Sequence, residues 1–402
     1  MGIGDRSTVM SKKPTAVLDF GTSKVLALVT QNPADRNLGI SSAGMAAYNG
    51  YMNNHWNNPE EVTDAIASAI EAAEKRGNLK IKEIYVGIPG EYIRVYVVES
   101  SVTLQGADPK VTPRDVDLLF QQATEMLNNP SGVILHRSPA WFRVDDGQKT
   151  MEPVDRKGSR LEGMIGFVLA DQHFINDVTS RLDDLGIKIM GFYSSSLGEA
   201  MQLIPYEERD NTGILIDVGY LSTEIVAMEG DAIIWQHIVP IGGAHITMDL
   251  SQVLNAQFDL CERIKRSFSF NESQNAEIEV QAEDGKVETF SGKLVSDVIG
   301  ARVNEILELC NDAIDKSGVH IPDNSVIYFT GGGIMPMKGA KVYVGSSFKQ
   351  TVREGNTRTS KMTPAHIYAS GYGLLALVCD RLEEEEEAEG GFFEKIRNFF
   401  HR

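Results

Sequence analysis

TAVLDFGTSKVLALVT, at residues 15–30, shares one plan with TGILIDVGYLSTEIVAME, at residues 212–229. In each stretch an apolar strand leads into an aspartate, one further residue and a glycine, and a short turn then leads into a second apolar strand. Two apolar runs around a glycine turn predict a β-hairpin in both places. Because Asp19 and Asp217 hold matching positions, the repeat indicates a fold built of two related halves, each opening on a hairpin.

Strand and helix patterns alternate along the rest of the chain. Residues 81–89 and 325–333 read as buried strands, while residues 58–78 and 114–129 have the apolar spacing of helices. This alternation predicts an α/β protein. Between the two halves, residues 88–167 carry polar and irregular stretches, which favours an inserted subdomain.

Composition limits the class of protein. The chain has 402 residues, of which 42% are hydrophobic and 23% charged, an ordinary globular balance. A net charge of −18 argues against nucleic acid as a partner. The three cysteines are scattered and lack metal-ligand spacing, which fits a reducing, cytoplasmic compartment. The sequence contains no apolar run long enough to span a membrane and no signal-peptide pattern, so we expect neither.

The first hairpin has the residues of a phosphate-binding turn. Its first strand delivers Asp19, and the turn Gly21-Thr22-Ser23-Lys24 follows. Glycine permits close approach of the backbone to a ligand, and consecutive amides and hydroxyls suit phosphate oxygens. A carboxylate beside phosphates suits Mg²⁺, usually through water. Because this pattern occurs in many hairpins, the turn alone is weak evidence for a nucleotide site.

Two further glycine turns strengthen the signal. The second hairpin offers an acid, a glycine and two hydroxyls, namely Asp217, Gly219, Ser222 and Thr223. The third turn follows the strand in residues 325–333 and consists of Gly331, Gly332 and Gly333. Glycines after a buried strand are typical of a helix N-terminus, where free amides attract anions. The P-loop and G-x-G-x-x-G patterns are absent. Three such turns together favour nucleotide binding, with two hairpins holding one polyphosphate from both sides.

These motifs occur in an order that resembles the actin-like ATPase superfamily, and more closely the FtsA family of bacterial cell-division actin homologues. The resemblance runs from about residue 15 to the last residue and rests on LDFGTSKVLALV, LIDVGYLSTEIV, VPIGGAHITMDL, CERIK, FTGGGIMPMKG, ASGYGLL and the phenylalanine-rich tail. It implies an α/β, actin-like two-lobed fold of duplicated mixed β-sheet cores with flanking helices. It also implies ATP with Mg²⁺ in the cleft, an inserted subdomain and a C-terminal amphipathic helix.

The resemblance implies the following divisions: 1–87 for the N-terminal part of the first lobe, 88–167 for the inserted subdomain, 168–380 for the remainder of the first lobe and the second lobe with the nucleotide cleft, 381–390 for an acidic linker, and 391–402 for a membrane-targeting helix.

The resemblance also assigns roles to individual positions. Phosphate and Mg²⁺ contacts are assigned to Asp19, Gly21, Thr22, Ser23 and Lys24 in the first lobe, and to Asp217 and Gly219 in the second. The hairpin pattern itself adds the hydroxyls of Ser222 and Thr223 as ATP-binding candidates. The remaining cleft positions are Gly242 and Gly243 lining the cleft, Glu262 and Lys265 near the ribose and adenine, and Gly331, Gly332 and Gly333 beside the nucleotide. Mg²⁺ would be held by Asp19 and Asp217, through water. Glu199 falls where the superfamily often keeps a water-positioning residue, and is the candidate catalytic residue.

One departure from the superfamily pattern lies in the second hairpin. Many superfamily ATPases have D-x-G-G-G-T there, whereas this chain has Tyr220 and Leu221 in place of two glycines. Bulkier residues restrict φ and the approach of the backbone to a terminal phosphate. We therefore expect ATP binding and, at most, weak ATPase activity. His245 beside the paired glycines is interpreted as structural.

The last residues form a separate unit in the sequence. On a helix, residues 391–402 place Phe392, Phe393, Ile396, Phe399 and Phe400 on one face. The polar face carries Lys395, Arg397 and Arg402. This pattern is typical of an interfacial membrane anchor. The preceding run Glu383–Glu387 is predicted as an extended or fraying linker, with the solvated end of the preceding helix as the alternative. Docking of the terminal helix on its own domain is the alternative to membrane binding.

By resemblance, the protein is expected to assemble as a polymer on the cytoplasmic face of the bacterial membrane and to tether FtsZ polymers at the division site, alongside other divisome proteins. Two alternatives remain open from the sequence. A small-molecule kinase of the same fold would require a catalytic base facing a substrate pocket. A related actin-like membrane scaffold, such as a pilus-assembly protein, would share both the cleft and the anchor.

Overall fold

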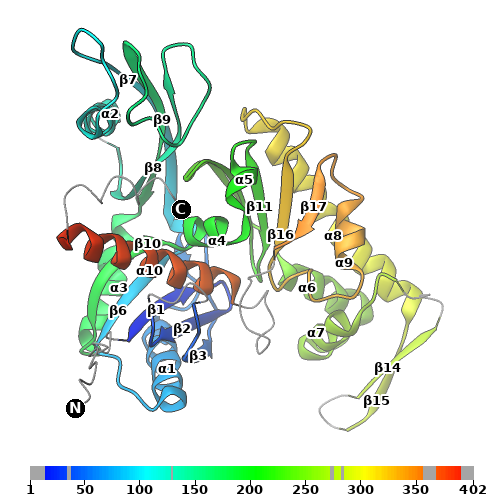
Figure 1. The fold of residues 1–402 in the computed structure, drawn as a ribbon. Coiled ribbons are helices and arrows are strands. Elements are labelled where there is room, and N and C mark those ends of the chain that lie inside the picture. Colours follow the sequence, from blue (N-terminus) through cyan, green and yellow to red (C-terminus); the bar gives the residue numbers. More distant parts are fainter. Residues whose placement is uncertain are drawn as a thin grey trace, which may run out of the picture.

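The computed structural model describes residues 14–33, 38–127, 130–271, 276–281, 285–355 and 368–390, with the backbone alone for 385–390. Figure 1 shows two lobes side by side and a smaller unit at one end of the first lobe. Each lobe has a five-stranded sheet, and the smaller unit has a three-stranded one. The predicted α/β architecture of two lobes with an inserted subdomain is confirmed.

The first lobe is built on a mixed sheet with the first predicted hairpin at its centre. Its strands are β1 (Thr15–Phe20), β2 (Lys24–Thr30), β3 (Ser42–Ala47), β6 (Glu83–Ile88) and β10 (Lys188–Ser194). They lie in the order β10-β6-β1-β2-β3. β1, β2 and β3 pair antiparallel, whereas β6 pairs parallel with both β1 and β10. Asp19 therefore lies at the end of a central strand.

Helices cover both faces of this sheet, so β1 is buried on both sides. α1 (Pro59–Gly77) and α3 (Gln172–Asp184) contribute to the same core cluster as Leu18. α10 (Ala369–Gly390) packs on the opposite face, against Val17. A strand buried on both faces reads as a continuous apolar run, which explains the unbroken pattern TAVLDF.

The second lobe repeats the plan of the first. Its strands are β11 (Gly213–Val218), β12 (Thr223–Glu229), β13 (Ala232–Val239), β16 (Val326–Thr330) and β17 (Thr351–Glu354). They lie in the order β13-β12-β11-β16-β17, with an antiparallel meander of β11, β12 and β13 and parallel pairing of β11, β16 and β17. The predicted duplication, with a hairpin at the start of each half, is therefore confirmed.

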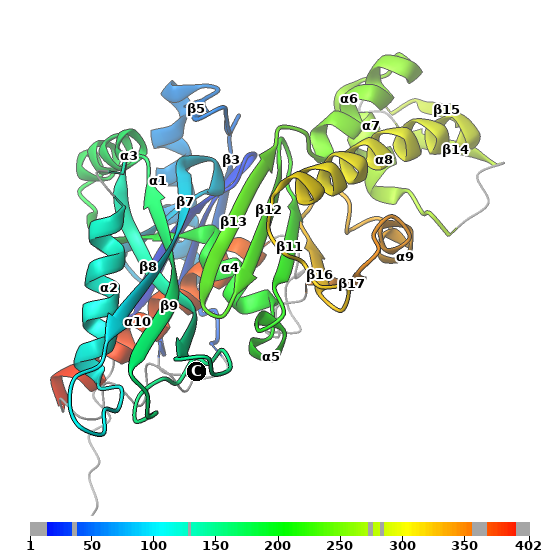
Figure 2. The ribbon, with the colours of Figure 1, turned by 90° about the horizontal axis from the view of Figure 1, so that it is seen from above.

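Helices pack against the second lobe on two sides, on its outer side and in the region between the lobes. α6 (Gly243–Leu254), α7 (Phe258–Ser267) and α8 (Gly292–Lys316) build the outer core. α4 (Ser195–Leu203) packs between the two lobes, because its buried side chains share one cluster with residues of both sheets, including Leu215. Figure 2 shows α4 between the two sheets.

The inserted unit is a small sheet with one helix. It contains β7 (Ile93–Thr103), α2 (Pro113–Met126), β8 (Val133–Val144) and β9 (Arg160–Ala170). The strand order is β7-β9-β8, with its own apolar core under α2. The unit also contacts the second lobe, since a Cβ atom on Gly166 would lie 2.7 Å from the carbonyl oxygen of Ile233 in β13. The insert thus packs against both halves of the molecule.

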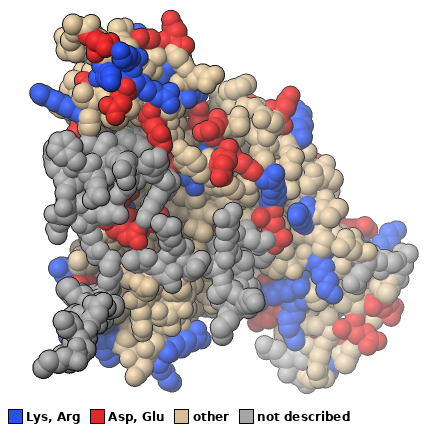
Figure 3. All heavy atoms as spheres, viewed as in Figure 1, with Lys and Arg blue, Asp and Glu red and all other residues tan. Residues whose placement is uncertain are grey.

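The remaining elements are short. They are β4 (Tyr51–Met52), β5 (His55–Trp56), the 3-10 turn η1 (Gly90–Tyr92), α5 (Tyr206–Arg209), β14 (Glu277–Gln281), β15 (Val287–Ser291) and α9 (Ala340–Gly345). On the part of the surface drawn in Figure 3, acidic and basic side chains are interspersed. This is the ordinary charge pattern of a solvated surface.

Two local expectations differ from the structure. Residues 381–390, expected as an acidic linker, continue α10 to Gly390, which matches the alternative of a solvated helix end rather than an extended segment. Glutamate is a good helix former, so a strong preceding helix can continue through the run despite its charge repulsion. The triple glycine is not followed by a helix N-terminus, because residues 332–336 form turns and α9 begins only at Ala340. The predicted amphipathic helix at 391–402 lies outside the described residues.

Candidate functional site: a cleft between the two hairpins

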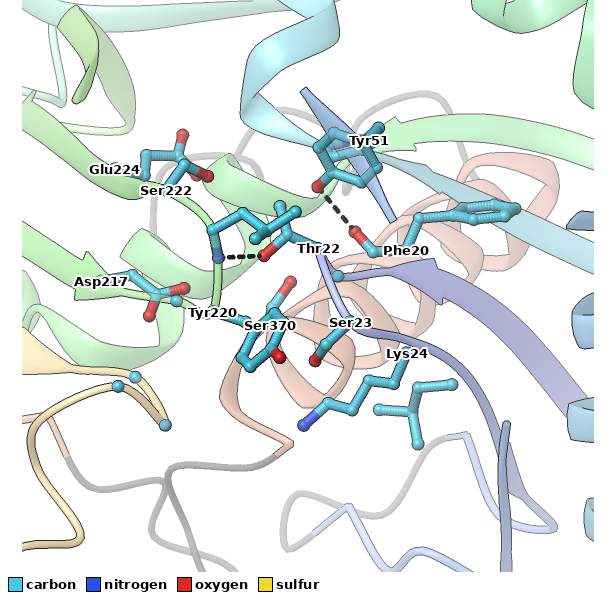
Figure 4. A pocket seen from close by; sticks show the side chains of 18 of the residues that line it. Phe20, Thr22, Ser23, Lys24, Tyr51, Asp217, Tyr220, Ser222, Glu224 and Ser370 are labelled. Atoms are coloured by element: carbon cyan, nitrogen blue, oxygen red, sulfur yellow. Dashed lines mark hydrogen bonds between the residues drawn. The ribbon is translucent and has the colours of Figure 1, made fainter. Parts of the chain in front are cut away.

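The first hairpin turns its carbonyl groups toward two tyrosines. The amide of Gly21 donates to the carbonyl of Lys24 (2.9 Å), which closes the turn. The Tyr48 hydroxyl donates to the Gly21 carbonyl (2.8 Å), and the Tyr51 hydroxyl donates to the Phe20 carbonyl (3.0 Å). A carbonyl oxygen repels a phosphate, but these two oxygens already accept hydrogen bonds from the tyrosine hydroxyls. Ser23 and Lys24 point into the cleft (Figure 4).

The second hairpin has the same turn geometry and is supported from behind by α6. The Gly219 amide donates to the Ser222 carbonyl (2.9 Å). At the start of α6, the amides of Gly243 and Ala244 donate to the carbonyls of Gly219 (2.9 Å) and Tyr220 (2.8 Å). The free amides of this helix terminus are therefore used to hold the hairpin in place.

The triple glycine is explained by its contact with the second hairpin. Gly331 has φ +97°, and a Cβ atom there would lie 2.2 Å from Oδ1 of Asp217. The Gly333 amide donates to the carbonyl of Val218 (2.8 Å). At Gly332, by contrast, a Cβ atom would meet nothing within 4 Å. Gly331 and Gly333 are thus required by packing, while Gly332 borders the open cleft.

The three turns meet around one cleft of about 1060 Å³ between the lobes. Most of the positions predicted from the sequence line it, namely Asp19, Gly21, Thr22, Ser23, Lys24, Glu199, Asp217, Gly219, Ser222, Glu262, Lys265, Gly331, Gly332 and Gly333. Residues that are far apart in the chain therefore share one cavity. Its size lies just above the usual range for a small-molecule site.

Three predicted residues do not line the cleft. Thr223 is fully buried, and its hydroxyl donates to the carbonyl of Ile241 (2.7 Å). Gly242 and Gly243 lie behind the second hairpin, where a Cβ atom on Gly242 would come within 2.7 Å of the Tyr220 carbonyl oxygen. The expectation that the paired glycines line the cleft is therefore corrected: they let α6 approach the hairpin.

The CERIK segment on α7 forms a network at one wall of the cleft. Lys265 pairs with Glu262 (Nζ to Oε2, 2.7 Å) and also donates to the Gly243 carbonyl (2.9 Å). The Thr247 hydroxyl donates to the same carboxylate. Burial lowers the pKa of Lys265, although the charge of Glu262 opposes this shift. The network fixes the edge of the cleft and leaves Arg266 beside it.

Asp19 is held by two serines from distant parts of the chain. The hydroxyls of Ser195 (2.7 Å) and Ser370 (3.2 Å) donate to Oδ1 of Asp19. Burial raises the pKa of Asp19, and these hydrogen bonds oppose that shift. Ser370 reaches the site because α4 and α10 touch where a Cβ atom on Gly373 would lie 2.5 Å from the amide nitrogen of Glu199. This crossing accounts for Gly373 in ASGYGLL, whereas Gly371 packs against Leu26 of β2.

Asp217 has an unsatisfied oxygen. Its Oδ1 is buried and has no hydrogen-bond partner among the described residues. Burial raises the pKa of Asp217, while the positive charge of Lys24 opposes the shift. An unpaired buried carboxylate oxygen is costly unless a cation or a water molecule satisfies it. The site therefore fits a metal-bound polyphosphate better than it fits a neutral ligand.

Two further carboxyl groups lie at the cleft. Glu199 is 2% exposed, and burial together with the charges of Asp217 and Glu224 raises its pKa well above the ordinary value. Burial raises the pKa of Glu224 to about 7, and its Oε1 accepts from Nε2 of Gln236 (2.7 Å). Because several acidic side chains line one cavity, a polyanion could bind there only together with a cation that neutralises part of its charge.

The site residues that sequence reasoning missed include Tyr48, Tyr51, Ser195, Glu224 and Ser370. An acid inside the apolar strand after Thr223 was a usable signal for Glu224. The serines and tyrosines had no such signal, because each is brought in by tertiary packing. Within the described part of the chain, no three His, Cys, Asp or Glu side chains are grouped to hold a metal ion by themselves. A Mg²⁺ ion would instead take most ligands from phosphate and water.

Comparison with known proteins identifies the family. A family model described as "Cell division protein FtsA" matches residues 214–373, and another, "SHS2 domain inserted in FTSA", matches residues 90–169, which correspond to the inserted unit. The FtsA protein of Neisseria meningitidis serogroup B is 27% identical over 96% of this chain and 97% of its own length. That of Bacillus subtilis is 24% identical over 90% of this chain and 82% of its own.

Solved structures agree on the fold. A chain of the PilM–PilN type IV pilus biogenesis complex has a TM-score of 0.59 at 16% identity, covering 91% of this chain and 98% of its own. MreB5 of Spiroplasma citri bound to AMPPNP has a TM-score of 0.53 at 11% identity, covering 94% and 99%. Since both FtsA family models and full-length FtsA relatives match, this chain belongs to the FtsA family of bacterial cell-division actin homologues.

Proposed function

We propose that this protein binds ATP with Mg²⁺ in the cleft between its lobes, self-assembles on the inner face of the cytoplasmic membrane and tethers FtsZ polymers at the division site. The observation that carries the nucleotide part is the meeting of three glycine turns from both lobes around the unsatisfied Oδ1 of Asp217. The solved MreB5 structure with AMPPNP, which has the same fold, supports this proposal.

Within the proposed site, the first hairpin would bind phosphates with its amides, the Ser23 hydroxyl and the Lys24 ammonium group. Mg²⁺ would neutralise phosphate charge, with Asp19 and Asp217 holding its waters. The wall of Glu262, Lys265 and the triple glycine would receive the nucleoside. The residues present fit ATP with Mg²⁺. The cavity supplies hydrogen-bond donors for the phosphate oxygens and carboxylate oxygens for the waters of Mg²⁺.

Glu199 has a limited part in hydrolysis under this proposal. Burial and the nearby acidic charges raise the pKa of its carboxyl group, which favours the form that carries a proton. In that form it can orient water as a hydrogen-bond donor. The expectation of weak ATPase activity at most rests on Tyr220 and Leu221, which stand in place of two glycines of the superfamily pattern in the second hairpin.

Membrane attachment is proposed from the sequence of residues 391–402 and from no element of the described structure. None of the helices in the described part of the chain is long and apolar enough to cross a membrane. A short amphipathic helix binds a bilayer reversibly, and several copies carried by one polymer bind far more firmly by effective concentration. Assembly and membrane binding are therefore coupled in this proposal.

Replacing Asp217 by asparagine is expected to weaken Mg²⁺-dependent binding of a fluorescent ATP analogue by about tenfold or more, equal to about 1.4 kcal/mol. The amide keeps the size of the side chain and loses the charge that holds the ion. The same change at Asp19 should act in the same direction. In wild-type protein EDTA should reduce the affinity, and in Asp217→Asn it should have little further effect.

Asp312→Asn is the matched control, because Asp312 is an exposed acid on α8 that pairs with Lys316 away from the cleft. Its nucleotide affinity should equal that of the wild type. If the analogue binds Asp217→Asn and Asp19→Asn as tightly as the parent in Mg²⁺, the assignment of the cleft is wrong. Thermal unfolding of each variant distinguishes a lost site from a lost fold.

A further inference from the structure

The two hairpins have the same turn but different residues at its tip. In each, a glycine amide donates to the carbonyl three residues later, from Gly21 to Lys24 and from Gly219 to Ser222. The two tip residues are Thr22 and Ser23 in the first hairpin and Tyr220 and Leu221 in the second. One tip therefore offers two hydroxyl groups near the backbone, and the other offers an aromatic and an aliphatic side chain.

The tips of the two hairpins are in direct contact. The Leu221 amide donates to Oγ1 of Thr22 (3.0 Å), which joins the two lobes across the cleft. Figure 4 shows this bond as a dashed line. Ser23 and Lys24 lie on one side of it, and Ser222 and Glu224 lie on the other. Leu221 is only 8% exposed, so its side chain is packed at this contact. The two tips therefore meet at this point, through one hydrogen bond and the packed Leu221 side chain.

Several hydrogen-bond donors of the second hairpin are already used within the protein. The Leu221 amide is bonded to Thr22, and the Thr223 hydroxyl to the Ile241 carbonyl. The Ser222 side chain lies beside the carboxylate of Glu91, in η1 of the first lobe, and opposes the rise in the pKa of Glu91 that burial causes. A phosphate group that enters between the tips would have to break the bond of the Leu221 amide, and Oγ1 of Thr22 would then lose its donor.

The first hairpin is arranged differently. Its Gly21 and Phe20 carbonyls are bonded by Tyr48 and Tyr51, while Ser23 and Lys24 face the cleft. It can receive a phosphate without disturbing the contact between the tips. The same cleft is lined by Glu199 and Glu224 together with Asp217, so a further phosphate would add negative charge beside several carboxyl groups.

We propose that the cleft selects its nucleotide by phosphate number, binding the nucleoside diphosphate more tightly than the triphosphate, with Tyr220 and Leu221 as the specificity-determining residues. This inference rests on the proposed nucleotide site. A diphosphate ends at the first hairpin and leaves the Thr22–Leu221 bond in place. A third phosphate has to enter between the tips, where it separates Thr22 from Leu221 and displaces packed side chains. The bound diphosphate thus keeps the two lobes joined.

The test measures the affinity of the full chain, in MgCl₂, for ADP and for AMPPNP, which has three phosphate groups and is not hydrolysed. Wild-type protein should bind ADP at least about tenfold more tightly than AMPPNP, the ratio expected for one lost hydrogen bond to a buried partner. In Tyr220→Gly/Leu221→Gly the ratio should fall to within about threefold, through tighter AMPPNP binding, with ADP affinity little changed.

Two results would overturn the inference: equal affinities in the wild type, or a ratio that the double substitution leaves unchanged. In both cases ADP still binds and the proposed nucleotide site stands. Failure of both nucleotides to bind wild-type protein would instead overturn the nucleotide site itself. If the glycine variant loses its fold, Tyr220→Thr/Leu221→Ser, which copies the tip of the first hairpin, decides the question with the same two ligands.

Discussion

Deleting residues 391–402 should remove at least about nine-tenths of the protein that sediments with anionic liposomes, because those residues carry the apolar face that would enter the bilayer. Full burial of five large apolar side chains is worth at most about 7–15 kcal/mol. Part of this gain is offset by folding a helix that is marginal in water and by incomplete burial at the interface. The remainder is enough for reversible attachment, and it is lost entirely in the truncated chain.

The truncation should leave the rest of the protein intact, since residues 391–402 lie beyond α10. Nucleotide affinity and thermal unfolding of the truncated chain serve as controls. A matched variant distinguishes the contribution of the apolar face of the predicted helix from that of its charges. Phe392→Ser/Phe399→Ser keeps every charge and should lose nearly as much liposome binding as the deletion. Equal sedimentation of the full and truncated chains would mean that the anchor lies elsewhere, or that the terminal helix docks on its own domain.

Gly331→Ala is expected to lower the free energy of unfolding by about 2–4 kcal/mol and to abolish nucleotide binding. The backbone at this position has φ +97°, which L-residues rarely adopt, and the added Cβ would lie 2.2 Å from Oδ1 of Asp217 and 2.3 Å from the Val218 carbonyl oxygen. Backbone atoms cannot move aside as a flexible side chain can. The loop would therefore shift away from the second hairpin and deform the cleft.

Gly332→Ala is the control, as the same methyl group is added one residue later, where nothing lies within 4 Å. Its free energy of unfolding should change by less than about 1 kcal/mol. Urea denaturation of both variants measures the difference. Equal stability of the two would show that the triple glycine does not pack against the second hairpin as the structure describes.

The two hairpins were predictable because their signals are local. An apolar strand, an aspartate and a glycine lie within a few residues of one another, and the pairing of β1 with β2 and of β11 with β12 follows the chain. The same locality explains why Asp19 and Asp217 could be chosen from the sequence. A glycine that follows a strand, however, can either border a ligand site or allow another element to pack closely. Gly332 borders the cleft, whereas Gly242 lets a helix approach, and nothing local distinguishes the two.

The rest of the site depends on packing between distant segments. Ser370 reaches Asp19 only because α4 and α10 touch at Gly198 and Gly373. The contact between Thr22 and Leu221 joins two turns that the sequence treats as separate motifs. The sequence showed that the second tip was bulky, and the structure adds that its amide is already bonded. Long-range contacts of this kind leave no periodic or local trace in a single sequence.

The most direct test of the proposed tether is a three-component flotation experiment with liposomes, FtsZ polymers and this protein in Mg-nucleotide. FtsZ should float with the liposomes when the full chain is present, and it should remain at the bottom of the gradient when the chain lacks residues 391–402. If the full chain floats with the liposomes and FtsZ still remains at the bottom, the protein binds membrane without tethering FtsZ, and the proposed role at the division site is wrong.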